Sequence, residues 1–135
     1  ETRICLFRVD SPQSIGHHAR AGDLLPIDRG APGHVLLAFS GEPGERYDRI
    51  RRDFFCATLG ERDPQVSSIA APVFRIGQQL VGSLAVTGPT TRFDETTAAK
   101  HREPLKSIAN DLTRQLGGKT EEHDPNRRRA IDDRA

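Results

Sequence analysis

Two β-favouring segments separated by a short, glycine-containing connection place the strongest constraint on how this chain can fold. Residues 66–74 and 80–87 are rich in β-branched and small side chains, and the connection over 75–79 contains Gly77. A connection of this length with a glycine is typical of a β-hairpin. The sequence therefore predicts two antiparallel strands in the middle of the chain.

The second of these strands has two different faces. Side chains alternate along a strand, so residues two apart lie on the same side of the sheet. One face is small and hydroxyl-bearing, and the other is mostly aliphatic and requires a packed helix. The first face carries Val81, Ser83, Ala85 and Thr87, and the second carries Leu80, Gly82, Leu84 and Val86. The small residues leave room for a ligand, or they accommodate a tightly packed helix.

The remaining segments predict helices and two early strands. Residues 31–39 begin with Pro32 in a first turn, where its missing N–H costs nothing, and 44–54 form a second, more polar helix. Short strands are expected over 3–9 and 15–20. A strand so near the first residue has no preceding partner, so we expect the chain to start inside a domain.

A third helix follows Asp94, which is a suitable N-cap. Pro104 predicts a kink or a restart there, because proline removes a helical hydrogen bond. Gly117 and Gly118 end the helix. Its apolar stripe is the clearest helical pattern in the chain, and it consists of Leu105, Ile108, Ala109, Leu112 and Leu116.

Length and composition limit the class of protein. A chain of 135 residues forms one domain, here residues 1–118, and the charge-balanced segment 119–135 predicts a disordered tail. The formal net charge of +1 gives no basic field for nucleic acid. The longest apolar run, 35–39, is too short for a membrane span. Cys5 and Cys56 are too few for a disulfide framework, which favours a cytoplasmic protein.

Patterns that carry enzymatic or metal chemistry have simpler interpretations. His17 and His18 are adjacent on a predicted strand and point to opposite faces, so they do not form a metal site. Cys56 is interpreted as a buried, inert thiol, and Glu61 with Asp63 as turn residues. The basic run 127–129 is flanked by aspartates and is interpreted as a solvated tail, with a weak phosphate contact left open. No catalytic residue, cofactor or metal ligand is predicted.

Three motifs, in order, resemble the effector-binding domain of the IclR family of bacterial transcriptional regulators. The first motif consists of Leu25-Pro26, followed by Gly33 and the apolar run 36–39. The second is an acidic residue and a turn followed by the strand 69–74, and the third is the strand 80–87 followed by Gly88-Pro89 and, shortly after, Arg92. The resemblance covers roughly residues 22–117.

This resemblance implies an α+β, GAF-like domain: an antiparallel sheet with helices on one side and a ligand pocket on the other, roofed by the Gly33 helix. It also implies a small organic or aromatic acid as effector, operator DNA bound through a helix-turn-helix domain outside this chain, and a homodimer or tetramer. The implied ligand-binding residues are Gly33, Thr58, Ser68, Ala85 and Thr87, with looser placement of Ile15 and His18. Ser83 is added as a candidate because it shares the small, hydroxyl-bearing face with Ala85 and Thr87.

The chain departs from the family pattern at positions that matter for the ligand. Thr58, Ser68 and Ala85 stand where members that bind small oxoacids carry an acidic residue, a cysteine and a serine, and His34 replaces the usual lysine. The identity of the effector therefore does not follow from the resemblance. The alternative is a stand-alone GAF-like binding protein or enzyme, without a DNA-binding partner.

Overall fold

The computed structural model describes residues 1–10 and 20–120. The strand expected over 15–20, apart from Arg20, and all but the first two residues of the tail expected over 119–135 lie outside the described residues. The elements in chain order are β1 (Thr2–Ile4), β2 (Leu24–Pro26), α1 (Ala31–Ala38), α2 (Glu45–Asp53), β3 (Cys56–Asp63), β4 (Val66–Arg75), a 3-10 turn (Ile76–Gln78), β5 (Gln79–Pro89) and α3 (Glu95–Gln115).

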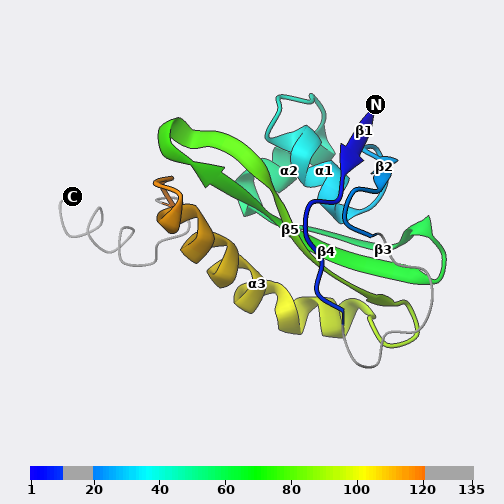
Figure 1. Cartoon of the computed structure of the whole chain (residues 1–135). Helices are drawn as coiled ribbons and strands as arrows, with labels where there is room; N and C mark the ends of the chain where they lie inside the picture. The colour runs from blue at the N-terminus through cyan, green and yellow to red at the C-terminus, as the bar shows by residue number, and fades with distance from the viewer. Residues whose placement is uncertain (11–19, 121–135) are drawn as a thin grey trace.

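A three-stranded antiparallel sheet in the order β3-β4-β5 forms the centre of the domain, and β1 pairs with β2 in a separate small sheet. The long helix α3 covers one face of the central sheet, and α1 with α2 covers the other (Figure 1). The predicted hairpin between β4 and β5 is confirmed, and so is the α+β class. Helices therefore flank both faces, and the helix that contains Gly33 covers the face on which the resemblance placed the ligand pocket.

The core beneath α3 is built from alternate residues of β4 and the inner side of the helix. Ile69, Ala71 and Val73 point to this face, and all are buried. They meet Phe93, Ala98, Leu105 and Ala109, while the partly buried Leu84 of β5 packs against the same cluster. The aliphatic face of β5 thus packs against α3 through Leu84, in agreement with the prediction that a helix covers it.

Helix α3 begins where the sequence predicted but is not interrupted. The Asp94 side chain accepts a hydrogen bond from the Thr97 N–H at 2.9 Å, which confirms the cap. The prediction of a restart at Pro104 is wrong, because α3 continues through it to Gln115, and the kink stays a prediction. Pro104 and Lys100, whose carbonyl loses its helical donor, are both exposed, so water can satisfy that carbonyl.

Only part of the apolar stripe predicted along α3 is buried. Leu105 and Ala109 are buried, whereas Ile108 is 58% exposed. The inner face includes the polar Thr113 instead, which is 1% exposed and whose hydroxyl accepts from the Phe74 N–H at 3.2 Å. A buried polar side chain is stable there because it satisfies a backbone donor.

Strand β3 is an element that the sequence reading missed. Glu61 and Asp63 were interpreted as turn residues, yet both belong to β3, which pairs antiparallel with β4. The register shifts between Leu59 and Asp63, and Gly60 has a φ of +73°, which a glycine adopts without strain. The strand therefore bends at the point where its charged residues begin.

The first strand is shorter than expected. It was predicted over 3–9, but β1 ends at Ile4 and pairs with β2 over three residue pairs. Beyond it, Phe7 and Val9 are 92% and 96% exposed. Within the two described ranges, no helix has the length and apolar character needed to cross a membrane.

Candidate functional site

The pairing register of the central sheet brings the predicted site residues together on one face. Thr58 of β3 lies opposite Ser68 of β4, and Ser68 lies opposite Thr87 of β5. Ala85 is opposite Ala70 in the next row. These residues share the face that α1 covers, because Ala70 packs with the buried residues of that helix. Three hydroxyls therefore form a row across the sheet, which we call the hydroxyl row (Thr58, Ser68 and Thr87).

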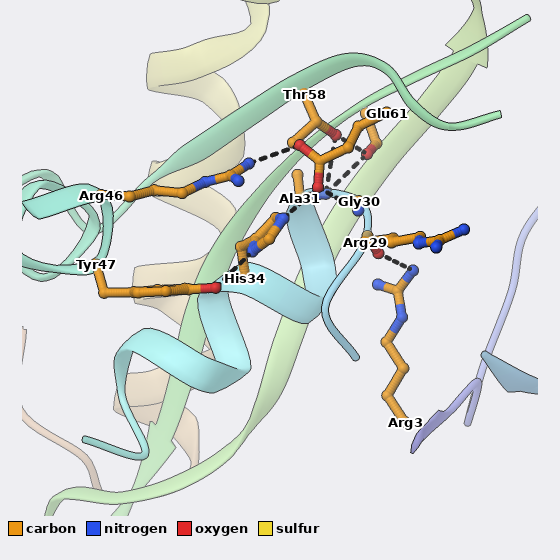
Figure 2. Close-up of polar contacts among 10 residues, drawn as sticks. Arg3, Arg29, Gly30, Ala31, His34, Arg46, Tyr47, Thr58 and Glu61 are labelled. Carbon is orange, nitrogen blue, oxygen red and sulfur yellow. Dashed lines mark hydrogen bonds and ion pairs between the residues drawn. The ribbon is translucent and has the colours of Figure 1, made fainter. Parts of the chain in front are cut away.

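Thr58 and Ser68, the two buried members of the hydroxyl row, accept a hydrogen bond from the start of α1. The Ala31 N–H donates to Thr58 Oγ1 at 3.0 Å and to Ser68 Oγ at 3.3 Å, and the two hydroxyl oxygens lie 3.2 Å apart (Figure 2). The next residue, Pro32, has no N–H to offer. The helix N-terminus, which we expected to supply donors to a ligand, thus has its first N–H already paired inside the protein.

The β5 side of the site is more open than the β3 side. Ser83 is partly buried and donates its hydroxyl to the Pro32 carbonyl at 3.1 Å, which ties β5 to the first turn of α1. Ala85 and Thr87 are exposed. The predicted site is consequently divided into a buried part under α1 and an accessible part along β5.

Gly33 allows close packing within the protein, whereas the sequence analysis expected it to allow the close approach of a ligand. A Cβ at this position would lie 2.1 Å from the Ile27 carbonyl oxygen, so the glycine permits α1 to pack against the segment that follows β2. The close approach expected for a ligand is occupied at this point by the protein backbone. Gly33 remains a candidate site residue only through its position in the first turn of α1.

A charge network centred on the buried ring of His34 lies beside the hydroxyl row, and the sequence did not predict it. The ring of His34 is 2% exposed; its Nε2 contacts Glu61 Oε1, and its Nδ1 lies 3.1 Å from the Tyr47 hydroxyl (Figure 2). Arg46 Nη2 donates to Glu61 Oε2 at 2.6 Å. This network joins α1, α2 and β3.

The electrostatics of the network favour an ionised Glu61. Burial raises the pKa of the Glu61 carboxyl, but hydrogen bonds from His34 and Arg46 outweigh that effect and leave its pKa below the ordinary value. An ionised carboxylate can only accept, so His34 Nε2–H donates to Glu61, while Nδ1 hydrogen-bonds with the Tyr47 hydroxyl. His34 therefore positions two helices and a strand.

Cys56 has the properties of an unreactive thiol. The side chain is 7% exposed, and burial raises the pKa of the thiol to about 11. Only the thiolate is a nucleophile, so the interpretation of Cys56 as a buried thiol is confirmed. Within the described ranges, no group of three metal-ligating side chains comes together. His17 and His18 lie outside those ranges.

Two hollows in the surface lie away from the hydroxyl row. The larger has a volume of about 300 Å³ and is lined by Glu1, Ile27, Asp28, Leu37, Glu42 and Tyr47. The smaller, about 20 Å³, lies between β4 and α3 and holds roughly one water molecule. Neither contains a residue of the row, and Ile15 and His18 lie outside the described residues. The ligand pocket therefore remains a prediction.

Comparison with known proteins identifies the family. Residues 44–114, more than half of the chain, match the family of the bacterial transcriptional regulator IclR C-terminal domain. The chain belongs to the IclR family. The resemblance seen in the sequence is thereby confirmed, and the family is one of transcriptional regulators, not of enzymes. A comparison with curated proteins gave no significant match.

Solved IclR-family structures share the fold. One putative IclR-family regulator domain aligns with a TM-score of 0.75 and 19% identity, covering 87% of this chain and 82% of that one. The C-terminal domain of a putative regulator from Vibrio cholerae gives 0.66 and 25%, with 85% and 78% covered. A putative regulator from Rhodococcus sp. gives 0.74 and 21%, with 85% of this chain but only 53% of that one. The chain thus corresponds to about half of the Rhodococcus protein.

Proposed function

We propose that this chain is the effector-sensing domain of an IclR-type regulator, and that it binds a small organic or aromatic acid next to the hydroxyl row. The observation that carries the proposal is the register Thr58–Ser68–Thr87, which lines up three hydroxyls beside the first turn of a helix. Family membership supports a regulatory role. Binding of the acid changes how a DNA-binding domain, outside these residues, is presented to its operator.

The accessible β5 part is where we place the ligand. Thr87 offers a hydroxyl, and Ala85 beside it leaves space above the sheet; both are exposed. A carboxylate is well bound by several hydroxyl and N–H donors, which replace its water without introducing another charge. Thr58 and Ser68 take part by turning their hydroxyls from the Ala31 N–H toward the ligand.

The wider properties follow from the same proposal. The net charge of +1 is small, so operator DNA is contacted through the helix-turn-helix domain and not through this one. The regulator is a cytoplasmic homodimer or tetramer. The boundaries of the domain, 1–118, and of the charged tail, 119–135, belong to this proposal. A stand-alone binding protein or enzyme is the competing function, but no observation in the structure favours it.

A thermal-shift screen of this chain against small aliphatic and aromatic acids tests the proposal. A ligand present at 100 times its dissociation constant adds about 2.7 kcal/mol of stability, which raises the melting temperature by a few degrees. Thr87→Leu fills the accessible part with an apolar side chain and is expected to abolish the shift.

The matched control is Val86→Leu, which alters the neighbouring, 41% exposed residue on the opposite face of the strand. It should retain the full shift. Equal shifts in Thr87→Leu and wild type would place the ligand elsewhere, and the absence of any shift across the panel would refute the effector-binding proposal for this chain.

A further inference from the structure

Arg3 is a buried cation for which the described part of the chain provides no anionic partner. The residue is 9% exposed, and its Nε has no hydrogen-bond partner. Its Nη2 donates to the Arg29 carbonyl oxygen at 3.2 Å. Among residues 1–10 and 20–120, no carboxylate forms an ion pair with Arg3. A guanidinium in this position has lost much of its water without gaining a counter-charge.

The surroundings of Arg3 add positive charge. Gly30 lies between two arginines: a Cβ placed on it would be 3.2 Å from Arg3 Nη2 and 3.8 Å from Arg62 Cβ. Burial, and then the charge of Arg62, lower the pKa of the Arg3 guanidinium. Figure 2 shows the Arg29 side chain leaving the turn on the side from which Arg3 approaches. We call Arg3, Arg29 and Arg62 the arginine cluster.

The carboxylate of Glu61, which contacts the Gly30 turn, binds other groups. Glu61, next to Arg62 in β3, is held by His34 and Arg46 on the opposite side of the Gly30 turn (Figure 2). It also accepts, at 3.4 Å, from the Gly30 N–H. Its charge is thus already balanced, and the arginine cluster forms no described ion pair. Folding a buried arginine beside another arginine is costly unless an anion is bound.

From these contacts we infer that the arginine cluster is a binding site for a small oxyanion, a carboxylate or a phosphate, at the turn that precedes α1. The planar guanidinium of Arg3 offers its free Nε–H, and a planar fork of donors suits two oxygens of one anion. Arg62 supplies a second positive charge beside Arg3. Arg3 is only 9% exposed, so a bulky nucleic-acid backbone does not reach it, and the inference is restricted to a small anion.

This site is separate from the hydroxyl row and goes beyond the proposed effector binding. The row is formed by hydroxyls on the sheet, whereas the cluster is formed by charges from β1, β3 and the Gly30 turn. An anion here would also hold β1 against α1, because Arg3 is the buried residue of β1. The site therefore couples the small β1-β2 sheet to the helix that covers the hydroxyl row.

Titration calorimetry of the whole chain with inorganic phosphate, and separately with acetate, tests the inference, with chloride used to keep the ionic strength constant. We expect saturable binding of at least one of the two. Tighter binding of phosphate would identify a phosphate site, and tighter binding of acetate a carboxylate site. Arg3→Gln should remove binding, since it deletes the charge and the fork.

Arg62→Gln keeps the experiment informative if Arg3→Gln fails to fold, because Arg62 is only partly buried. It should weaken binding on the order of tenfold, as expected for the loss of one charge-assisted contact. The control Arg49→Gln removes the same charge from a 63% exposed side chain on α2 and should leave binding unchanged.

Two results would overturn the inference: no saturable binding of either anion by the wild type, or equal weakening by Arg62→Gln and Arg49→Gln, which would indicate a non-specific charge effect. These failures are distinguishable from failure of the proposed function. Effector binding is judged by the Thr87→Leu and Val86→Leu pair, and oxyanion binding by the arginine variants.

Discussion

The two faces of the central sheet are built by different means. Beneath α3, alternate residues of β4 such as Ile69 and Val73 pack against apolar helix residues, and this face is held mainly by burial. Beneath α1, the same strand presents Ser68, whose hydroxyl bonds a helix N–H, and the adjoining network contains a buried His34 and a charged Glu61. The α3 face is therefore held mainly by apolar contacts, whereas the α1 face combines a buried apolar cluster of its own with polar groups.

The largest expected effect comes from removing apolar volume on the α3 face. Ile69 is 0% exposed, and Ile69→Ala should lower the free energy of unfolding by about 2–5 kcal/mol, because it deletes buried methyl groups and leaves a cavity. Urea denaturation monitored by circular dichroism measures the loss. A change below about 1 kcal/mol would contradict the division of roles between the two faces.

A smaller but substantial effect is expected from adding volume on the α1 face. Gly33→Ala places a Cβ 2.1 Å from the Ile27 carbonyl oxygen, so the backbone of one segment must move. The free energy of unfolding should fall by about 1–3 kcal/mol. In an unobstructed helix the same change stabilises by roughly 1 kcal/mol, so an increase in stability would show that α1 does not pack against that segment.

Neutralising Glu61 tests the charge network of the α1 face. Glu61→Gln should cost about 1 kcal/mol near neutral pH, because charge-assisted hydrogen bonds from His34 and Arg46 are weakened. Burial, which raises the pKa of Glu61, is outweighed by these bonds, so the folded-state pKa lies below that of the unfolded chain.

The sign of the pH dependence follows from that lowered pKa. The stabilisation is complete above the ordinary carboxyl pKa of about 4.3 and is lost as the pH falls through the lower folded-state pKa. The difference in stability between wild type and Glu61→Gln should therefore shrink in acid. Denaturation curves from pH 7 to pH 3 measure it, and a difference independent of pH would argue against an ionised Glu61 in the network.

The smallest effect is expected on the outer side of α3. Ile108 is 58% exposed, so Ile108→Ala should change the free energy of unfolding by less than about 0.5 kcal/mol. Leu105→Ala, at a position that is 4% exposed, serves as its buried counterpart on the same helix and should cost several times more. Equal losses in the two variants would mean that the outer stripe is covered in solution.

Local patterns predicted most of the fold because they report on local physics. The alternation in β5 separated the Ser83 face from the Leu84 face, and Asp94 marked the start of α3. Strand β3 escaped because its pattern is inverted: the polar Thr58 is buried while Leu59 is 42% exposed. The effect of Pro104 was also not predictable locally. The free-energy cost of a proline within a helix depends on whether the carbonyl that loses its donor is exposed to water, and a local sequence pattern does not record this exposure.

The sequence and the resemblance predicted that several of the candidate residues lie together, but not how they bond to one another. Alternation and the family resemblance placed Thr58, Ser68 and Thr87 together, and the register brings them opposite one another. The contact of His34 with Glu61 joins residues 27 positions apart and depends on how α1 crosses the sheet. The replacement of lysine by histidine and the acidic residue of the motif were the available signals, but only their tertiary juxtaposition reveals the pair.

The hydrogen bonds that the Ala31 N–H already makes affect how strongly a ligand can bind at this position. Any ligand that takes this donor must displace Thr58 Oγ1 and Ser68 Oγ, so the domain contains its own competitor for the site. The two hydroxyls already bond to each other at 3.2 Å, so they regain no partner when they are displaced. The net affinity of such a ligand is then the difference between the hydrogen bonds that it makes and those that it replaces. This internal competition raises the ligand concentration at which the domain is half occupied.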